Sequence, residues 1–122
     1  MRINRLAFLA VLAPLLVLSH SAARAECPYP QAPASVPNGK SATEAEMLQA
    51  MTLFKKYDAE VNAFVACLDE ETKARLQEGG GTSQLIQFKS LQLRKQNAAV
   101  DELRNKAEKF NEQVRAYKAA RG

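Results

Sequence analysis

Residues 47–68 read MLQAMTLFKKYDAEVNAFVACL, and this stretch decides the fold. Apolar side chains recur in it at alternating spacings of three and four residues, at Met47, Ala50, Phe54, Tyr57, Val61, Phe64 and Leu68. Met51 and Val65 widen the same stripe. Such a period of about 3.5 residues is typical of a coiled-coil helix that packs along a partner helix of similar length. We therefore expect an all-α fold.

Sequence signals bound this first helix at both ends. The segment Ser41-Ala42-Thr43-Glu44 has the form of a capping box, in which a hydroxyl and a later glutamate satisfy free backbone amides. Gly79-Gly80-Gly81 ends the helix, because each glycine costs about 1 kcal/mol inside one. We expect helices at about residues 43–78 and 83–120, the second capped by Thr82 or Ser83.

The second helix carries two apolar series at seven-residue spacing. One consists of Ile86, Leu93, Val100, Ala107 and Val114, and the other of Leu103, Phe110 and Tyr117. A short glycine turn between two such helices predicts an antiparallel hairpin over residues 41–122. Facing residues should then have numbers that sum to about 161, since the helix rise is equal on both sides. Phe54 would lie near Ala107. Leu85, Phe88 and Leu91 fall on a neighbouring face and form a candidate interaction patch.

The two halves of the hairpin carry opposite charge. Residues 26–78 hold 9 acidic and 5 basic side chains, a net charge of −4, while residues 79–122 hold 4 acidic and 9 basic, a net charge of +5. The helices should attract each other, although one exposed pair contributes less than about 1 kcal/mol. We interpret Asp69-Glu70-Glu71 as a solvated face answered by Lys89, Arg94 and Lys95. Three successive helical positions point about 100° apart and do not converge on one cation.

Residues 1–25 have the three parts of a secretory signal peptide. Arg2 and Arg5 precede an apolar run of 13 residues at 6–18, and Ala23-Arg24-Ala25 supplies the small residues of a cleavage site. We predict cleavage between Ala25 and Glu26. The run is shorter than the roughly 20 residues of a membrane span, and Glu26 does not fit the lipid-attachment signal. A soluble periplasmic or secreted protein is expected, with no membrane attachment after cleavage.

Cleavage changes which functions the chain can support. The net charge falls from +4 to +1, because the leader carries three arginines and no acid. A nearly neutral chain does not favour nucleic-acid binding. His20, the only histidine, is also removed, which leaves no histidine for catalysis or metal binding. We predict no catalytic residue, no cofactor and no metal site, and we do not expect an enzyme.

The mature chain begins with a proline-rich segment, residues 26–40, which we call the arm. Its four prolines, at 28, 30, 33 and 37, favour an extended polyproline conformation. The 14 residues from Cys27 to Ser41 then span about 43 Å, and the 26 helical residues from Ser41 to Cys67 span about 39 Å. If the arm turns back at Asn38-Gly39, it packs along the first helix and brings Cys27 beside Cys67.

Two cysteines in an exported chain favour a disulfide. The matched lengths favour an intramolecular Cys27–Cys67 bond, which closes a loop of about 40 residues and stabilises by roughly 4 kcal/mol. The alternatives are an intermolecular bond or free thiols. A redox-active pair is disfavoured, because no second cysteine lies at the CxxC spacing.

The arm and the cysteine contexts also carry a resemblance. Cys27-Pro28-x-Pro30, Val36-Pro37-x-Gly39, Cys67-Leu68 and the closing stretch NAAVDELRNKAEKFNEQVRAYKA resemble a group of small secreted proteobacterial proteins without an assigned activity. The likeness covers nearly all of the mature chain. It implies a location in the Gram-negative envelope or outside the cell, and it transfers no catalytic residue.

Two hypotheses of function follow. The first is a structural or interaction protein of the bacterial envelope, whose helical face binds another copy, as a homodimer, or a different envelope protein. The second is a periplasmic client-binding chaperone or stress protein, because helical hairpins of mixed charge recur among such chaperones. The chain lacks the LTxxQ signature of one chaperone class, so we rank this hypothesis second.

Overall fold

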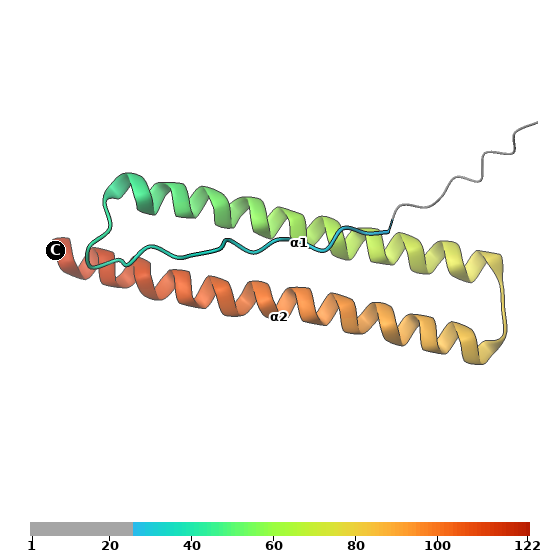
Figure 1. Cartoon of the computed structure of the whole chain (residues 1–122). Helices are drawn as coiled ribbons and strands as arrows, with labels where there is room; N and C mark the ends of the chain where they lie inside the picture. The colour runs from blue at the N-terminus through green and yellow to red at the C-terminus, as the bar shows by residue number, and fades with distance from the viewer. Residues whose placement is uncertain (1–25) are drawn as a thin grey trace, which may run out of the picture.

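The computed structural model describes residues 26–122. In this part of the chain two long helices, α1 (Glu44–Glu78) and α2 (Thr82–Arg121), lie antiparallel and side by side (Figure 1). They confirm the expected all-α two-helix hairpin. The predicted signal peptide, with Ala25 at its cleavage site, lies outside the described residues.

A capping box begins α1, two residues later than we expected. The Thr43 hydroxyl accepts from the Glu46 amide at 3.3 Å, and the Glu46 carboxylate accepts from the Thr43 amide at 2.6 Å. Ser41 belongs instead to the preceding turn, where its amide donates to the Asn38 carbonyl at 3.1 Å. The sequence offers two overlapping capping boxes, and the turn at Asn38 occupies the residues of the first.

Three glycines connect the helices. Gly79 and Gly80 have φ of 77° and 140°, a region of backbone conformation that favours glycine. Gly81 occupies the N-cap position of α2 and provides no side-chain cap. The prediction that Thr82 or Ser83 caps α2 is therefore wrong, because these are the first two residues of the helix itself.

The apolar stripe of α1 forms the core. All seven predicted residues, from Met47 to Leu68, are the buried residues of this helix. They divide into two clusters along the hairpin. One cluster surrounds Tyr57, Val61 and Leu68 and includes Cys27 of the arm; the other surrounds Phe54 and Phe110.

The first seven-residue series of α2 faces α1 only in part, because Ala107 and Val114 pack against the Phe54 cluster while the three residues nearer the turn do not. Ile86, Leu93 and Val100 are 62%, 58% and 38% exposed. The buried residues of α2 are Gln92, Ala99 and Phe110. In this orientation of the helix, Gln92 points inward and donates a hydrogen bond to Glu71 of α1 at 2.7 Å. Phe110, from the second predicted series, does face the core.

The register of the hairpin also differs slightly from the expected one. Phe54 stacks on Phe110 at 4.7 Å between ring centroids, rather than facing Ala107. Hydrogen bonds join Glu71 to Gln92 and Asp69 to Gln96. The residue numbers of these three pairs sum to 163–165. A glycine turn is compatible with more than one register, and these three pairs define the one that is observed.

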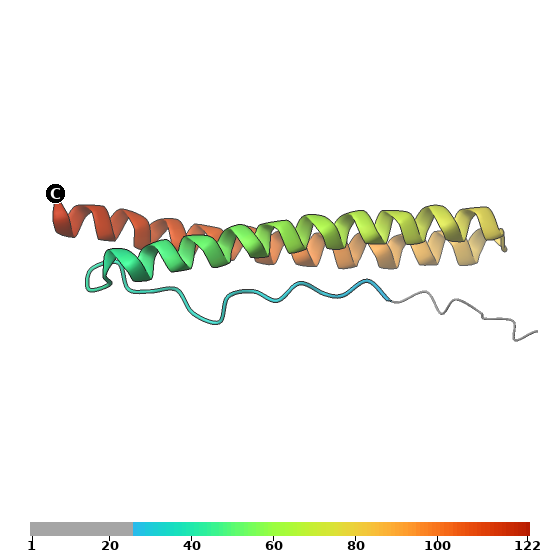
Figure 2. The ribbon, with the colours of Figure 1, turned by 90° about the horizontal axis from the view of Figure 1, so that it is seen from above.

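The arm lies on one side of the hairpin, over the groove between the helices (Figures 1 and 2). Tyr29 contacts Phe64 of α1 edge to face, with 5.2 Å between ring centroids. Pro33 and Val36 are half-buried, and Val36 packs against the Phe54 cluster. At the turn, the Gly39 amide donates to the Gln113 side chain of α2 at 2.9 Å. The arm thus forms a third layer that contacts both helices.

Candidate functional site

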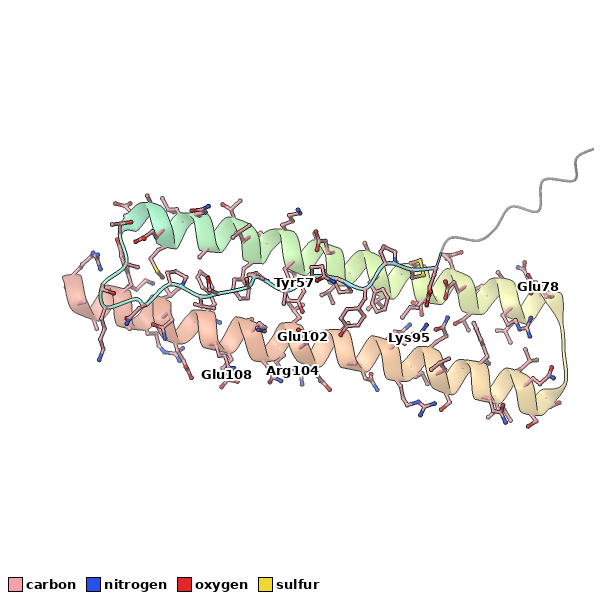
Figure 3. The ribbon with its side chains drawn as sticks, in the orientation of Figure 1. Tyr57, Glu78, Lys95, Glu102, Arg104 and Glu108 are labelled. Atoms are coloured by element: carbon pink, nitrogen blue, oxygen red, sulfur yellow. A yellow bond between two sulfur atoms is a disulfide. The ribbon has the colours of Figure 1, made fainter. Side chains whose placement is uncertain are left out.

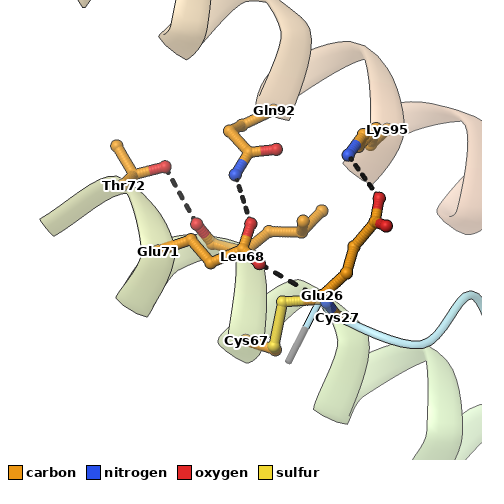
Figure 4. Close-up of a disulfide and its surroundings, with 8 residues drawn as sticks. All are labelled: Glu26, Cys27, Cys67, Leu68, Glu71, Thr72, Gln92 and Lys95. Carbon is orange, nitrogen blue, oxygen red and sulfur yellow. Dashed lines mark hydrogen bonds and ion pairs between the residues drawn. A yellow bond between two sulfur atoms is a disulfide. The ribbon is translucent and has the colours of Figure 1, made fainter. Parts of the chain in front are cut away.

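The predicted disulfide fixes the start of the arm to α1. Cys27 and Cys67 are bonded, with 5.8 Å between their Cα atoms and a sequence separation of 40 (Figure 4). Cys27 is buried and belongs to the Tyr57 cluster. In the loop-entropy description, a crosslink of this length stabilises the fold by about 4 kcal/mol.

Glu71 connects three parts of the molecule beside the disulfide. One carboxylate oxygen accepts from the Cys27 amide of the arm at 3.4 Å, and the other accepts from the Gln92 side chain of α2 at 2.7 Å (Figure 4). Gln92 is only 3% exposed. A buried amide needs an acceptor, so the carboxylate stabilises both the arm and the packing of α2.

The acidic side chains at residues 69–71 do not form the ion pairs that we expected with Lys89, Arg94 and Lys95. Asp69 accepts from Gln96 at 2.7 Å, and Glu70 pairs with Lys73 of its own helix at 2.6 Å. Lys95 instead approaches Glu26 of the arm at 3.6 Å. Sequence reasoning missed this polar cluster because glutamine side chains, which carry no charge, are its main donors.

The sulfur atoms of Cys27 and Cys67 and a carboxylate oxygen of Glu71 lie within 4.8 Å of one another. Three such groups could hold a metal ion if the sulfurs were thiolates. The two sulfurs are bonded to each other, so in the oxidised chain this cluster acts as a covalent crosslink and not as a metal site.

Tyr29 lines a cleft between the arm and α1. The cleft has a volume of about 430 Å³ and is lined by Pro28, Tyr29, Pro30, Gln31, Glu60, Ala63 and Phe64. The Tyr29 hydroxyl donates to Glu102 of α2 at 3.1 Å. Burial, this hydrogen bond and the charge of Glu102 all raise the pKa of Tyr29 above its ordinary value. Tyr29 therefore bridges α1 and α2 as long as it keeps its proton.

Tyr57 occupies the centre of the hairpin, as its place in the stripe predicted (Figure 3). It is 1% exposed, and its hydroxyl has no hydrogen-bond partner among the described residues. Burial, followed by the charges of Glu102 and Tyr29, raises the pKa of Tyr57. This hydroxyl stays protonated at neutral pH and serves the core.

The predicted patch of Leu85, Phe88 and Leu91 does not form a single exposed face. Leu85 and Phe88 are half-buried, while Leu91 is 44% exposed. The larger exposed apolar surface of α2 is the series Ile86, Leu93 and Val100. Sequence reasoning identified this series but assigned it to the contact with α1. Its seven-residue spacing is the signal for a helix-packing surface, whichever helix it meets.

No protein-family model, no curated protein and no solved structure matches the chain. Within residues 26–122, neither helix is long and apolar enough to span a membrane.

Proposed function

We propose that the chain is a non-enzymatic exported protein of the bacterial envelope that acts as a structural or interaction module. The observation that carries this proposal is that the arm covers one face of the hairpin (Figure 2), while apolar side chains of α2 remain exposed elsewhere. The arm is fixed over one face by the Cys27–Cys67 bond. On α2, by contrast, Leu93 and Val100 remain exposed. An exposed apolar row on an otherwise charged helix is typical of a surface that binds another protein.

Two observations support export. Disulfides form and persist in oxidising compartments such as the bacterial periplasm. The sequence of residues 1–25 has the charge, length and small residues of a cleavable signal peptide. The resemblance to small secreted proteobacterial proteins agrees with this location.

Site-specific photo-crosslinking in living cells tests the interaction. A photoreactive amino acid replaces Leu93 in one variant and the neighbouring exposed residue Asp101, which lies off the apolar row, in the control. We expect crosslinked products from the Leu93 variant and few from the control. A product with the mass of two chains identifies a second copy, and a different mass identifies another envelope protein. No product from position 93 contradicts the proposed function.

A client-binding chaperone is the second candidate. It is favoured by the number of large apolar side chains exposed along both helices, among them Leu48, Met51, Leu53 and Leu76 of α1. An aggregation-suppression assay with an unfolded client protein tests this activity directly. The chaperone hypothesis predicts protection that rises with the concentration of the chain, and no protection at stoichiometric excess eliminates it.

A further inference from the structure

The groove between the helices on the side away from the arm, which we call the far groove, is uncovered. It is lined near the middle of the hairpin by Met51, Phe54, Lys55, Asp58, Leu103, Ala107, Phe110 and Asn111. Nearer the turn it is lined by Asp69, Thr72, Lys89, Gln92, Leu93 and Gln96. Neither stretch includes a residue of the arm. Leu93 and Ala107 both line the far groove, so Val100, seven residues from each, lies on the same row.

This row of α2, which comprises Ile86, Leu93, Val100 and Ala107, has the period of a helix that packs against another helix. Its occupant should therefore offer a long helix of the same period. It should also be acidic, because α2 holds 4 acidic and 9 basic side chains, a net charge of +5. The chain itself contains such a helix. Its α1 holds 8 acidic and 4 basic side chains, a net charge of −4, and carries Met51 on its own side of the far groove.

We propose that the occupant of the far groove is a second copy of this chain, and that two hairpins form a four-helix bundle through their far grooves. The proposal rests on the proposed function and names its partner. Charge selects the arrangement: α1 of each copy lies beside α2 of the other, since the alternative places two helices of charge +5 together. Neighbouring helices are then antiparallel, the twofold axis runs parallel to them, and both glycine turns lie at the same end.

This arrangement places a specific ion pair between the copies. Facing residues within one hairpin have numbers that sum to 163–165. Rotation about an axis parallel to the helices does not change the position of a residue along that axis, so the same sum applies to facing residues of the two copies. Arg104 of the second copy therefore lies within about 6 Å along the axis of Asp58, at 1.5 Å per residue. Both side chains are exposed in the single chain. Within residues 26–122, Arg104 forms an ion pair with Asp101, one turn away, at 3.7 Å.

Light scattering on the oxidised mature protein is the first test. We expect twice the mass of one chain. The substitution Leu93→Glu should return the mass to that of one chain, while Leu91→Glu, at an exposed leucine off the row, should leave the dimer intact. Circular dichroism verifies that both variants remain helical. A wild-type protein that is monomeric at all concentrations overturns the proposal, and a Leu91→Glu variant that also dissociates does so too.

A charge exchange tests the pair. Asp58→Arg and Arg104→Asp should each shift the equilibrium towards the monomer, and the double variant should restore the dimer because each interface regains opposite charges. A double variant as monomeric as the single ones contradicts this arrangement.

The positions of the turns test the axis. A spin label on Gly81→Cys, where an added Cβ has no neighbour within 4 Å, reports the distance between the two turns. Turns at the same end give a short distance, whereas turns at opposite ends are separated by the length of a helix, about 50 Å. The long distance overturns the proposed axis. A monomer that still crosslinks to another envelope protein through position 93 refutes this proposal and leaves the proposed function standing.

Discussion

At the scale of single residues, Glu71 is the polar group that joins the arm, α1 and α2 beside the disulfide. It accepts hydrogen bonds from the arm and from the buried side chain of Gln92. Glu70, its neighbour in sequence, pairs with Lys73 of the same helix, and both partners of that pair are exposed. The two adjacent glutamates therefore form a matched pair of test positions.

We predict that Glu71→Ala lowers the free energy of unfolding by about 1–3 kcal/mol, because it leaves the buried Gln92 amide without its acceptor. Glu70→Ala should lower it by less than about 1 kcal/mol, as for other exposed ion pairs. Urea denaturation of both variants measures the difference. Equal effects of the two substitutions would show that Glu71 has no special role.

The tyrosine pair predicts how stability depends on pH. The pKa values of Tyr29 and Tyr57 are raised in the folded protein. A raised pKa means that the stabilisation is present in full below the unfolded value of about 10 and is lost as the pH rises through the folded value. The free energy of unfolding should therefore decrease above about pH 10. In Tyr29→Phe, which keeps the ring against Phe64, the decrease should be smaller; parallel profiles for the two proteins would contradict this.

At the scale of the elements, the arm depends on close contact between its turn and α2. A Cβ atom added at Gly39 would overlap the backbone carbonyl of Gln113. Gly81, in contrast, has an ordinary φ of −66° and open space around it. These two glycines allow the contact to be tested without changing the chemistry of any side chain.

We predict that Gly39→Ala destabilises the protein and increases hydrogen exchange at the arm, because the turn must move away from α2 and the hydrogen bond to Gln113 breaks. Gly81→Ala should change the free energy of unfolding by less than about 1 kcal/mol, because the restriction of the unfolded chain is offset by the loss of a glycine preferred at the N-cap. Thermal unfolding and hydrogen exchange measure both. An unchanged arm in Gly39→Ala would indicate that the turn does not pack as described.

The two helices differ in how far their faces could be predicted from the sequence. Every buried residue of α1 was predicted, because its large apolar side chains define a single stripe. In α2, two adjacent apolar series compete, and hydrophobicity does not decide which one meets α1. Near the turn the structure buries Gln92, which donates to Glu71 across 21 positions of sequence, and no hydrophobic pattern indicates this contact. The residue that caps α1 was predicted wrongly for a similar reason. Ser41 and Thr43 both begin a capping-box pattern, and Ser41 is part of the preceding turn, so Thr43 caps the helix.

The disulfide could be predicted because it depends on length and not on side-chain detail. An extended arm and a helix of known rise bring Cys27 and Cys67 together without any knowledge of the packing. The polar cluster around Glu71 could not be predicted in this way. Its donors are a backbone amide and a neutral side chain, and neither has a sequence pattern.

At the scale of the whole molecule, the disulfide supplies stability that a two-helix core of this size lacks. We predict that the double variant Cys27→Ser and Cys67→Ser loses about 4 kcal/mol of unfolding free energy, because the unfolded chain regains the entropy of the open loop. Urea denaturation measures the loss, and reduction of the wild-type protein should reproduce it. A double variant as stable as the oxidised wild type would contradict the predicted role of the bond.

The Cys27–Cys67 bond fixes the arm to α1, and we propose that the chain is exported. A tryptic map of the protein recovered from the periplasm without reduction tests both parts at once. We predict one crosslinked species that joins residues 26–40 to residues 57–73 and begins at Glu26. Trypsin itself cuts after Arg24, so a peptide that begins at Ala25 would show that the leader was not removed at the predicted site. Free thiols on the two separate peptides would contradict the disulfide.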